Sequence, residues 1–143
     1  MTSPAFEDWQ LALIEGLRVA RLATLTPAGA PHLVPVCYAL SEGRFFIPID
    51  EKPKSTTRLT RLRNIDRDPR GSLLFDRYDD DWTRLAWVRV DGVGDVLARG
   101  DSQPAALAGL RQRYAQYKRM NLEERPLIRI TPTALAAWRW QNG

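Results

Sequence analysis

The stretch that decides the fold is residues 31–49, which read PHLVPVCYALSEGRFFIPI. Two apolar, extended runs, residues 31–40 and 44–49, flank a short Ser-Glu-Gly turn, and this pattern predicts a pair of strands. Pro35 and Pro48 interrupt the runs, and proline has no N–H group to donate to a neighbouring strand. We therefore expect both prolines at strand ends, bulges or sheet edges, where open backbone can face a ligand.

Extended segments recur on both sides of this pair. Alternating or β-branched apolar residues predict further strands at residues 19–26, 71–76 and 82–97, with closing strand material at 127–130 and 137–140. Gly92 and Gly94 are expected to mark a bend or bulge in the longest of them. Many strands joined by short turns favour a closed or nearly closed β-barrel, because closure removes exposed sheet edges. We expect a mainly β protein with about six antiparallel strands.

Three amphipathic helices are expected to flank this barrel. The first spans Pro4–Leu17 with Ser3 as its cap, and the second spans Ser55–Asp66. The third spans about Gln103–Tyr117. The second helix should turn Leu59, Leu62 and Ile65 inward, and the third should bury Ala106, Leu107, Leu110, Tyr114 and Tyr117.

Composition narrows the class of protein. The 143 residues are 44% hydrophobic and 27% charged, which is ordinary for a globular protein, and we expect one domain over residues 1–143. The chain has no apolar run of bilayer length and no signal-peptide pattern at its start, so we expect a cytoplasmic protein. Cys37 and His32 are the only residues of their kinds, which excludes an intramolecular disulfide and a cysteine metal cluster. No metal site is therefore expected, and a Ser-His-Asp hydrolase is disfavoured.

Positive charge is concentrated between Lys52 and Arg70. This segment holds seven basic residues against two aspartates, whereas the rest of the chain is close to neutral. Within it, residues 47–64 place a strand end, a lysine-bearing loop and a Ser-Thr-Thr helix start in succession. Unpaired N–H groups at a helix start, together with lysine or arginine, bind phosphate. The segment therefore indicates a localised anion site, and an ordinary solvated basic helix is the alternative.

Three other signals have structural explanations that we favour. Asp76 and Asp79–Asp81 lack the alternating spacing and the glycine of a calcium loop, so we expect a solvated turn. Trp138 and Trp140 share one strand face, which fits a barrel core or a dimer seam better than a platform for nucleic-acid bases. Cys37 lies in an apolar strand and is expected to be an inert small residue, not a redox thiol.

Several segments, in their order along the chain, resemble one known family. They are residues 23–29 (ATLTPAG), Pro31-His32, residues 35–38 (PVCY), residues 63–70 (RNIDRDPR) and residues 88–92 (VRVDG). Together they are similar to the pyridoxamine 5'-phosphate oxidase-like split-barrel superfamily, and within it to the F420-dependent oxidoreductase branch. The resemblance extends over most of the chain, from Trp9 to Trp140.

The resemblance implies an FMN-binding split β-barrel that forms a homodimer with two cofactor sites at the subunit interface. It assigns Val36, Cys37 and Tyr38 to the cofactor ring, and Trp87 is expected near the ring from the partner subunit. The residues implied on the phosphate side are Ile49, Asp50, Lys52, Lys54, Arg58, Arg61 and Asn64. This chain departs from the family between Pro53 and Asn64, where its spacing is longer, so Lys54 and Arg61 compete for the phosphate.

The function implied by the resemblance is that of an F420-dependent oxidoreductase. Such an enzyme transfers a hydride between the deazaflavin coenzyme F420 and a small unsaturated substrate, and the coenzyme supplies the reactivity. No side chain is assigned a catalytic role, because Tyr38 is either a proton donor or simply a buried tyrosine with a satisfied hydroxyl. The alternatives are an FMN-dependent oxidase or flavin reductase of the same fold, and a non-catalytic binder of a cofactor or of nucleic acid. The leading hypothesis includes no nucleic-acid and no membrane partner.

Overall fold

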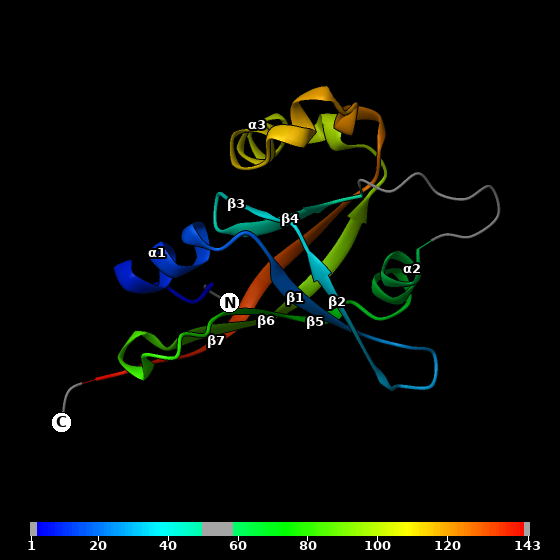
Figure 1. Ribbon diagram of the computed structural model, residues 1–143. Helices are drawn as coiled ribbons and strands as arrows, with labels where there is room; N and C mark the ends of the chain where they lie inside the picture. The colour runs from blue at the N-terminus through cyan, green and yellow to red at the C-terminus, as the bar shows by residue number, and fades with distance from the viewer. Residues whose placement is uncertain (1–2, 50–58, 142–143) are drawn as a thin grey trace.

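An antiparallel sheet of seven strands forms the centre of the molecule. The computed structural model describes residues 3–49 and 59–141, and within them the sheet has the order β2-β1-β5-β6-β7-β4-β3. The strands are β1 (Ala20–Leu25), β2 (Pro31–Val36), β3 (Ala39–Ser41), β4 (Arg44–Pro48), β5 (Arg70–Arg77), β6 (Ala86–Leu97) and β7 (Leu127–Arg139). The sheet curls into a partly open barrel whose edge strands are β2 and β3 (Figure 1). The structure thus confirms a mainly β, barrel-like fold.

Helices cover the ends of this barrel. Helix α1 (Asp8–Gly16) contacts β5 and β6 at one end, and α2 (Thr60–Arg67) contacts β1 and β6 at the other (Figure 1). Helix α3 (Pro104–Arg113) packs on β3 and is surrounded by the short 3₁₀ turns η2 (Gly100–Ser102), η3 (Ala115–Arg119) and η4 (Leu122–Glu124). We call residues 100–124 the cap, because Figure 1 shows them above the β3–β4 corner. None of the helices described is both long and apolar enough to cross a membrane.

Buried side chains form two groups. The first fills the barrel, where the ring of Phe75 lies 5.0 Å from that of Tyr38 and 5.2 Å from that of Phe45. The second lies between the cap and β3 and β4, and it includes Phe46 and Leu127. The predicted inward residues of the third helix are all buried in this second group: Ala106, Leu107, Leu110, Tyr114 and Tyr117. As predicted, Leu62 and Ile65 of α2 are buried in the first group, and Leu59, just before α2, packs against that group.

The number of strands differs from the prediction because one of the predicted strands is divided into two in the structure. The run predicted as a single strand over residues 31–40 ends at Val36 and resumes at Ala39 as β3, which gives seven strands where about six were expected. The interruption at Cys37 and Tyr38 has a tertiary cause, because side chains of the cap bond the backbone of Tyr38. At the other end of the chain, the two predicted closing pieces are parts of one strand, β7.

Two helix boundaries also differ. Helix α1 begins at Asp8 and not at Pro4, because Glu7 and Gln10 form a capping box in which the Gln10 side chain accepts the Glu7 N–H at 2.9 Å. Helix α3 ends at Arg113, because Tyr114 adopts an extended conformation with φ −129°. The predicted start of the second helix, Ser55–Thr57, lies outside the described residues.

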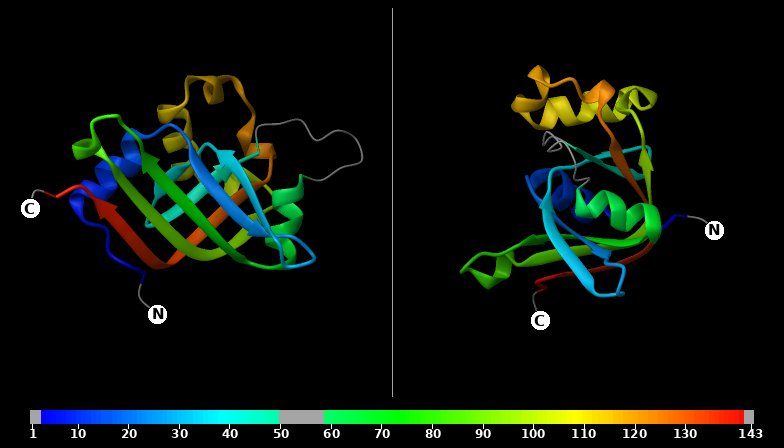
Figure 2. Two further views of the ribbon diagram at one scale, coloured as in Figure 1. Left: turned by 60° about the horizontal axis from the view of Figure 1, so that its bottom comes forward. Right: turned by 90° about the vertical axis from the view of Figure 1, so that its right-hand side faces the viewer.

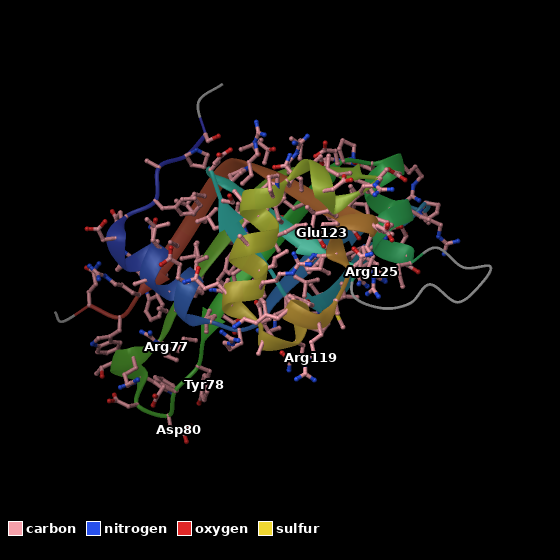
Figure 3. All side chains as sticks on the ribbon, turned by 90° about the horizontal axis from the view of Figure 1, so that it is seen from above. Arg77, Tyr78, Asp80, Arg119, Glu123 and Arg125 are labelled. Atoms are coloured by element: carbon pink, nitrogen blue, oxygen red, sulfur yellow. The ribbon has the colours of Figure 1, made fainter. Side chains whose placement is uncertain are left out.

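Two local features of the long β5–β6 hairpin agree with prediction. The pairing of β6 with β7 shifts register between Asp91 and Gly92, where a Cβ atom on the glycine would lie 2.5 Å from the Thr131 carbonyl oxygen. The acidic turn at the hairpin tip is exposed, and Figure 3 shows Tyr78 and Asp80 pointing away from the body. This tip projects beyond the barrel in Figure 2. The predicted strand start at Trp82 was wrong, because η1 (Trp82–Arg84) precedes β6.

Side chains within that acidic turn bond one another. Asp81 accepts hydrogen bonds from the backbone N–H and the hydroxyl of Thr83, and this lowers the pKa of the Asp81 carboxyl. Asp79 accepts the Asp81 N–H at 2.8 Å and pairs with Arg84 at 2.9 Å. In the parts of the chain that the structure describes, no group of three or more His, Cys, Asp or Glu side chains could hold a metal ion.

Candidate functional site

The barrel is split beside its edge strand β2, and a hollow lies at the split. Strand β3 pairs with β4 only as far as Phe46, so Ile47 and Pro48 extend beyond it. A hollow of about 210 Å³ is lined by Val19, Pro35, Val36, Cys37, Ile47, Pro48 and Arg61, and we call it the split hollow. Pro35 lies on the edge strand and Pro48 is the last residue of β4, so both prolines occupy the positions predicted for them.

Most of the described residues that line the split hollow have apolar side chains, and one is charged. Val36, Ile47 and Pro48 are buried and form its floor, whereas Val19 and Pro35 are exposed at its mouth. Among the described residues that line it, Arg61 contributes the one charged side chain and Cys37 the one thiol. The arrangement suits a flat apolar ring that carries an anionic substituent. None of the seven lining residues carries a carboxyl, imidazole or phenol group that could exchange a proton.

The structure brings three of the predicted residues together in the split hollow: Val36, Cys37 and Arg61. Arg61 comes from α2, whereas Val36 and Cys37 come from the end of β2. The carbonyl and N–H groups around Cys37 therefore lie where the strand ladder is interrupted. Among the phosphate-side candidates, Asp50, Lys52, Lys54 and Arg58 lie outside the described residues.

The Tyr38 side chain points away from the split hollow into the barrel. Its hydroxyl donates toward the carbonyl oxygen of Ile14 and lies 3.0 Å from that of Leu17. The side chain is 1% exposed, and this burial raises the pKa of Tyr38 to about 12. The hydroxyl is therefore buried and hydrogen-bonded. This is the second of the two alternatives given for Tyr38 from the sequence, the first being a proton donor.

Asn64 and Ile49 are also interior residues. Asn64 is 1% exposed, and its amide donates to the Thr24 hydroxyl at 3.0 Å and accepts from Arg67 at 3.1 Å. The bond to Thr24 fastens α2 to β1, because Thr24 lies in that strand. Ile49 belongs to the group of side chains that fills the barrel.

Trp87 lies on the outer face of the sheet. Its neighbours along β6, Ala86 and Val88, are buried, so Trp87 points to the opposite side. It is paired directly with Trp138 of β7, which is 43% exposed. Within one chain Trp87 is therefore remote from the inward-facing core side chains of the barrel.

Sequence reasoning missed one wall of the split hollow. Val19 precedes β1 and reaches the hollow only because the barrel curls, so no local pattern marks it. Pro48 had a usable signal, because proline at a strand end indicates open backbone. Arg61 had a weaker one, since it is one of several arginines in a basic segment.

The chain belongs to the pyridoxamine 5'-phosphate oxidase family. The family model of that description matches residues 6–139, which is nearly the whole chain. The fold, the split and the prolines at its edges had already indicated a split barrel.

Solved structures similar to this chain share its fold. The conserved hypothetical protein Rv2991 from Mycobacterium tuberculosis is 22% identical with a TM-score of 0.74, over 97% of this chain and 88% of that one. An F420 reductase is 20% identical with a TM-score of 0.66, over 92% of this chain and 98% of that one. A FAD-binding protein from Mesorhizobium loti is 20% identical with a TM-score of 0.68, over 96% of this chain and 97% of that one.

Proposed function

We propose that this protein is an F420-dependent oxidoreductase that transfers a hydride between the deazaflavin coenzyme and a small unsaturated substrate in the cytoplasm. The observation that carries the proposal is the split hollow. Apolar side chains line it, the strand ladder is interrupted beside it at Cys37, and the guanidinium of Arg61 lies in its lining. Membership of the family supports a flavin-type cofactor. The sequence resemblance and the similar F420 reductase support F420 over FMN.

The residues of the hollow fit such a coenzyme. Ring systems of this kind are flat and largely apolar, and the side chains of Val36, Ile47 and Pro48 offer a buried surface of that character. Both candidate coenzymes carry phosphate, and Arg61 can donate two parallel hydrogen bonds to phosphate oxygens. The coenzyme, when bound, supplies the hydride.

The protein's own contribution would be to bind and orient. The seven lining residues named above carry no carboxyl, imidazole or phenol group, so the site would act by positioning the ring and excluding water. The buried, bonded hydroxyl of Tyr38 faces the other way. A proton that the substrate needs would then come from solvent or from a residue of the partner chain.

A titration with both coenzymes tests this proposal, with Arg61→Ala as the decisive variant. We expect wild-type protein to bind F420 at micromolar or better affinity, and Arg61→Ala to bind it about ten- to a hundredfold more weakly, because a charge-assisted bond is lost. The matched control is Arg63→Ala, since Arg63 is exposed on the same helix and does not line the hollow. Fluorescence of the deazaflavin measures the affinity.

The outcomes separate the hypotheses. Tighter binding of FMN than of F420, or yellow protein as purified, would select the FMN-dependent alternative. Equal losses in Arg61→Ala and Arg63→Ala would mean that the helix acts only through its general positive charge. No affinity for either coenzyme would refute the proposal, and salt-sensitive binding of oligonucleotides would then favour the nucleic-acid binder.

We also propose that two copies associate through the outer face of the sheet. That face exposes Leu33 at 65% and Trp138 at 43%, and Trp87 lies beside Trp138. Large apolar side chains exposed on one sheet face are typical of an interface between subunits. In such a dimer, Trp87 of each copy would be available to the hollow of the other, as the resemblance implies.

Light scattering tests the dimer. We expect a particle of twice the 16.3 kDa chain mass, and Trp138→Glu should convert it to a monomer because it buries a charge in the seam. Gln116→Glu, at an exposed position of the cap, adds the same charge away from that face and should leave the mass unchanged. A monomeric wild type would refute this association.

A further inference from the structure

The backbone of Tyr38 is held by side chains and not by a strand. Its N–H donates to the Tyr114 hydroxyl oxygen at 3.2 Å, and its carbonyl oxygen accepts from Arg113 Nε at 2.9 Å. Both partners lie at the end of α3, in the cap. A buried backbone group needs a partner, so the cap replaces the ladder bonds that β2 and β3 lack at this point.

The Tyr114 hydroxyl makes a second bond that reaches the segment just before β1, the strand that pairs with β2. It donates to the Arg18 carbonyl oxygen at 2.8 Å. That carbonyl belongs to the peptide group that joins Arg18 to Val19, and the N–H that the hydroxyl accepts belongs to the peptide group that joins Cys37 to Tyr38. Val19 and Cys37 both line the split hollow. One hydroxyl group therefore ties together the two peptide groups that carry these lining residues.

Arginines on both sides of Tyr114 hold it in place. Arg113 donates to the carbonyl oxygens of Glu15 at 2.8 Å and Leu17 at 2.6 Å, at the end of α1. The Arg18 guanidinium lies 4.8 Å from the Tyr114 ring centre and also donates to the Arg113 carbonyl oxygen. Tyr114 itself is 6% exposed. Its hydroxyl is thus rigidly placed, as a group that sets the geometry of a site must be.

We propose that Tyr114 is a positioning residue for the cofactor site, whose hydroxyl sets the separation of the Val19 and Cys37 walls of the split hollow. The role as a cofactor site rests on the function proposed above, whereas the coupling of the cap to the walls rests on the contacts alone. Tyr114 touches no lining side chain through its hydroxyl, so it acts through the backbone. The cap, which is far along the chain from both walls, thereby controls the width of the hollow.

The rate at which Cys37 is alkylated tests this coupling without any cofactor. Cys37 is the single cysteine of the chain, so the thiol reports on this wall alone. Tyr114→Phe removes both bonds and should raise the alkylation rate about five- to thirtyfold, the factor expected for the loss of one or two hydrogen bonds. Leu107→Val is the matched control, because it loosens the buried side of the cap and leaves both bonds intact.

Coenzyme affinity gives the second readout. If the hollow holds F420 or FMN, Tyr114→Phe should weaken its binding by about tenfold while Leu107→Val binds as wild type does. Alkylation no faster in Tyr114→Phe than in Leu107→Val overturns the inference. Failure of the wild type to bind either coenzyme refutes the proposed function, but the alkylation rates still decide the coupling.

Hydrogen exchange on the unaltered protein covers the case in which Tyr114→Phe does not fold. The Tyr38 amide should exchange slowly although it belongs to neither strand, because the Tyr114 hydroxyl accepts it. Exchange of that amide as fast as an exposed loop amide would overturn the inference.

Discussion

Replacing Tyr38 by phenylalanine removes one hydroxyl from the barrel and leaves the ring that packs on Phe75. The hydroxyl donates toward the carbonyl oxygen of Ile14, which loses this donor, whereas the carbonyl oxygen of Leu17 keeps its bond from Arg113 at 2.6 Å. One buried carbonyl left without this donor costs about 1 to 2 kcal/mol of unfolding free energy. For a chain of this length that is a melting temperature lower by about 3 to 6 °C.

The pH dependence of stability provides a second, independent signature. Burial raises the pKa of Tyr38 from 10.0 to about 12, so the folded protein keeps the proton at pH values where the unfolded chain releases it. The stabilisation by this hydroxyl is therefore complete below pH 10.0 and is lost as the pH rises toward 12. Urea unfolding at about pH 8 and about pH 11 should show a smaller difference between wild type and Tyr38→Phe at the higher pH.

The functional expectation for this variant is the opposite of its effect on stability. Because the hydroxyl faces α1 and not the split hollow, coenzyme affinity should stay within about twofold of wild type. An unchanged unfolding free energy, or a difference that does not narrow with pH, would refute the placement of the hydroxyl. Loss of hydride transfer in a fully stable variant would instead assign Tyr38 a direct part in the chemistry.

Two further substitutions test other parts of the fold. Gly92→Ala should destabilise the protein by about 1 to 3 kcal/mol, because its Cβ would lie 2.5 Å from the Thr131 carbonyl oxygen. Thermal unfolding measures this, with Gly16→Ala as a control that should be neutral or stabilising since nothing lies within 4 Å of that Cβ. In the cap, hydrogen bonds from Arg111 lower the pKa of Glu123 from 4.5 to about 2. Its stabilisation is present above pH 4.5 and lost toward pH 2, so wild type should lose more stability on acidification than Glu123→Gln, and equal acid sensitivity would contradict the pairing. Figure 3 shows Glu123 on the cap.

The strands and the inward faces of the helices were predictable because buried residues recur at regular intervals along the sequence of each element. Val88 and Val90 are fully buried and alternate with half-exposed or exposed residues, and that period of two is legible in the sequence. The break between β2 and β3 is different. Residues 35–40 are apolar throughout, and the group that interrupts the ladder is Tyr114, 76 residues from Tyr38. A contact of that separation has no local pattern.

The candidate site was predictable where chemistry restricts the residue type. Proline at positions 35 and 48 indicated open strand edges, and the resemblance added Val36 and Cys37. Val19 could not be found, because its position in the split hollow depends on how the sheet curls. The basic segment indicated an anion site, but its periodicity did not single out Arg61, which lines the hollow among the described residues.

The prolines of the edge strand also affect how the protein behaves at high concentration. A strand edge with an uninterrupted row of N–H groups is a template onto which another chain can add, and fibres grow from such edges. Strand β2 carries Pro31 and Pro35, both exposed, and so cannot offer such a row. We expect concentrated, coenzyme-free protein to resist fibre growth through this edge, so that the opening in the barrel does not become a starting point for polymerisation.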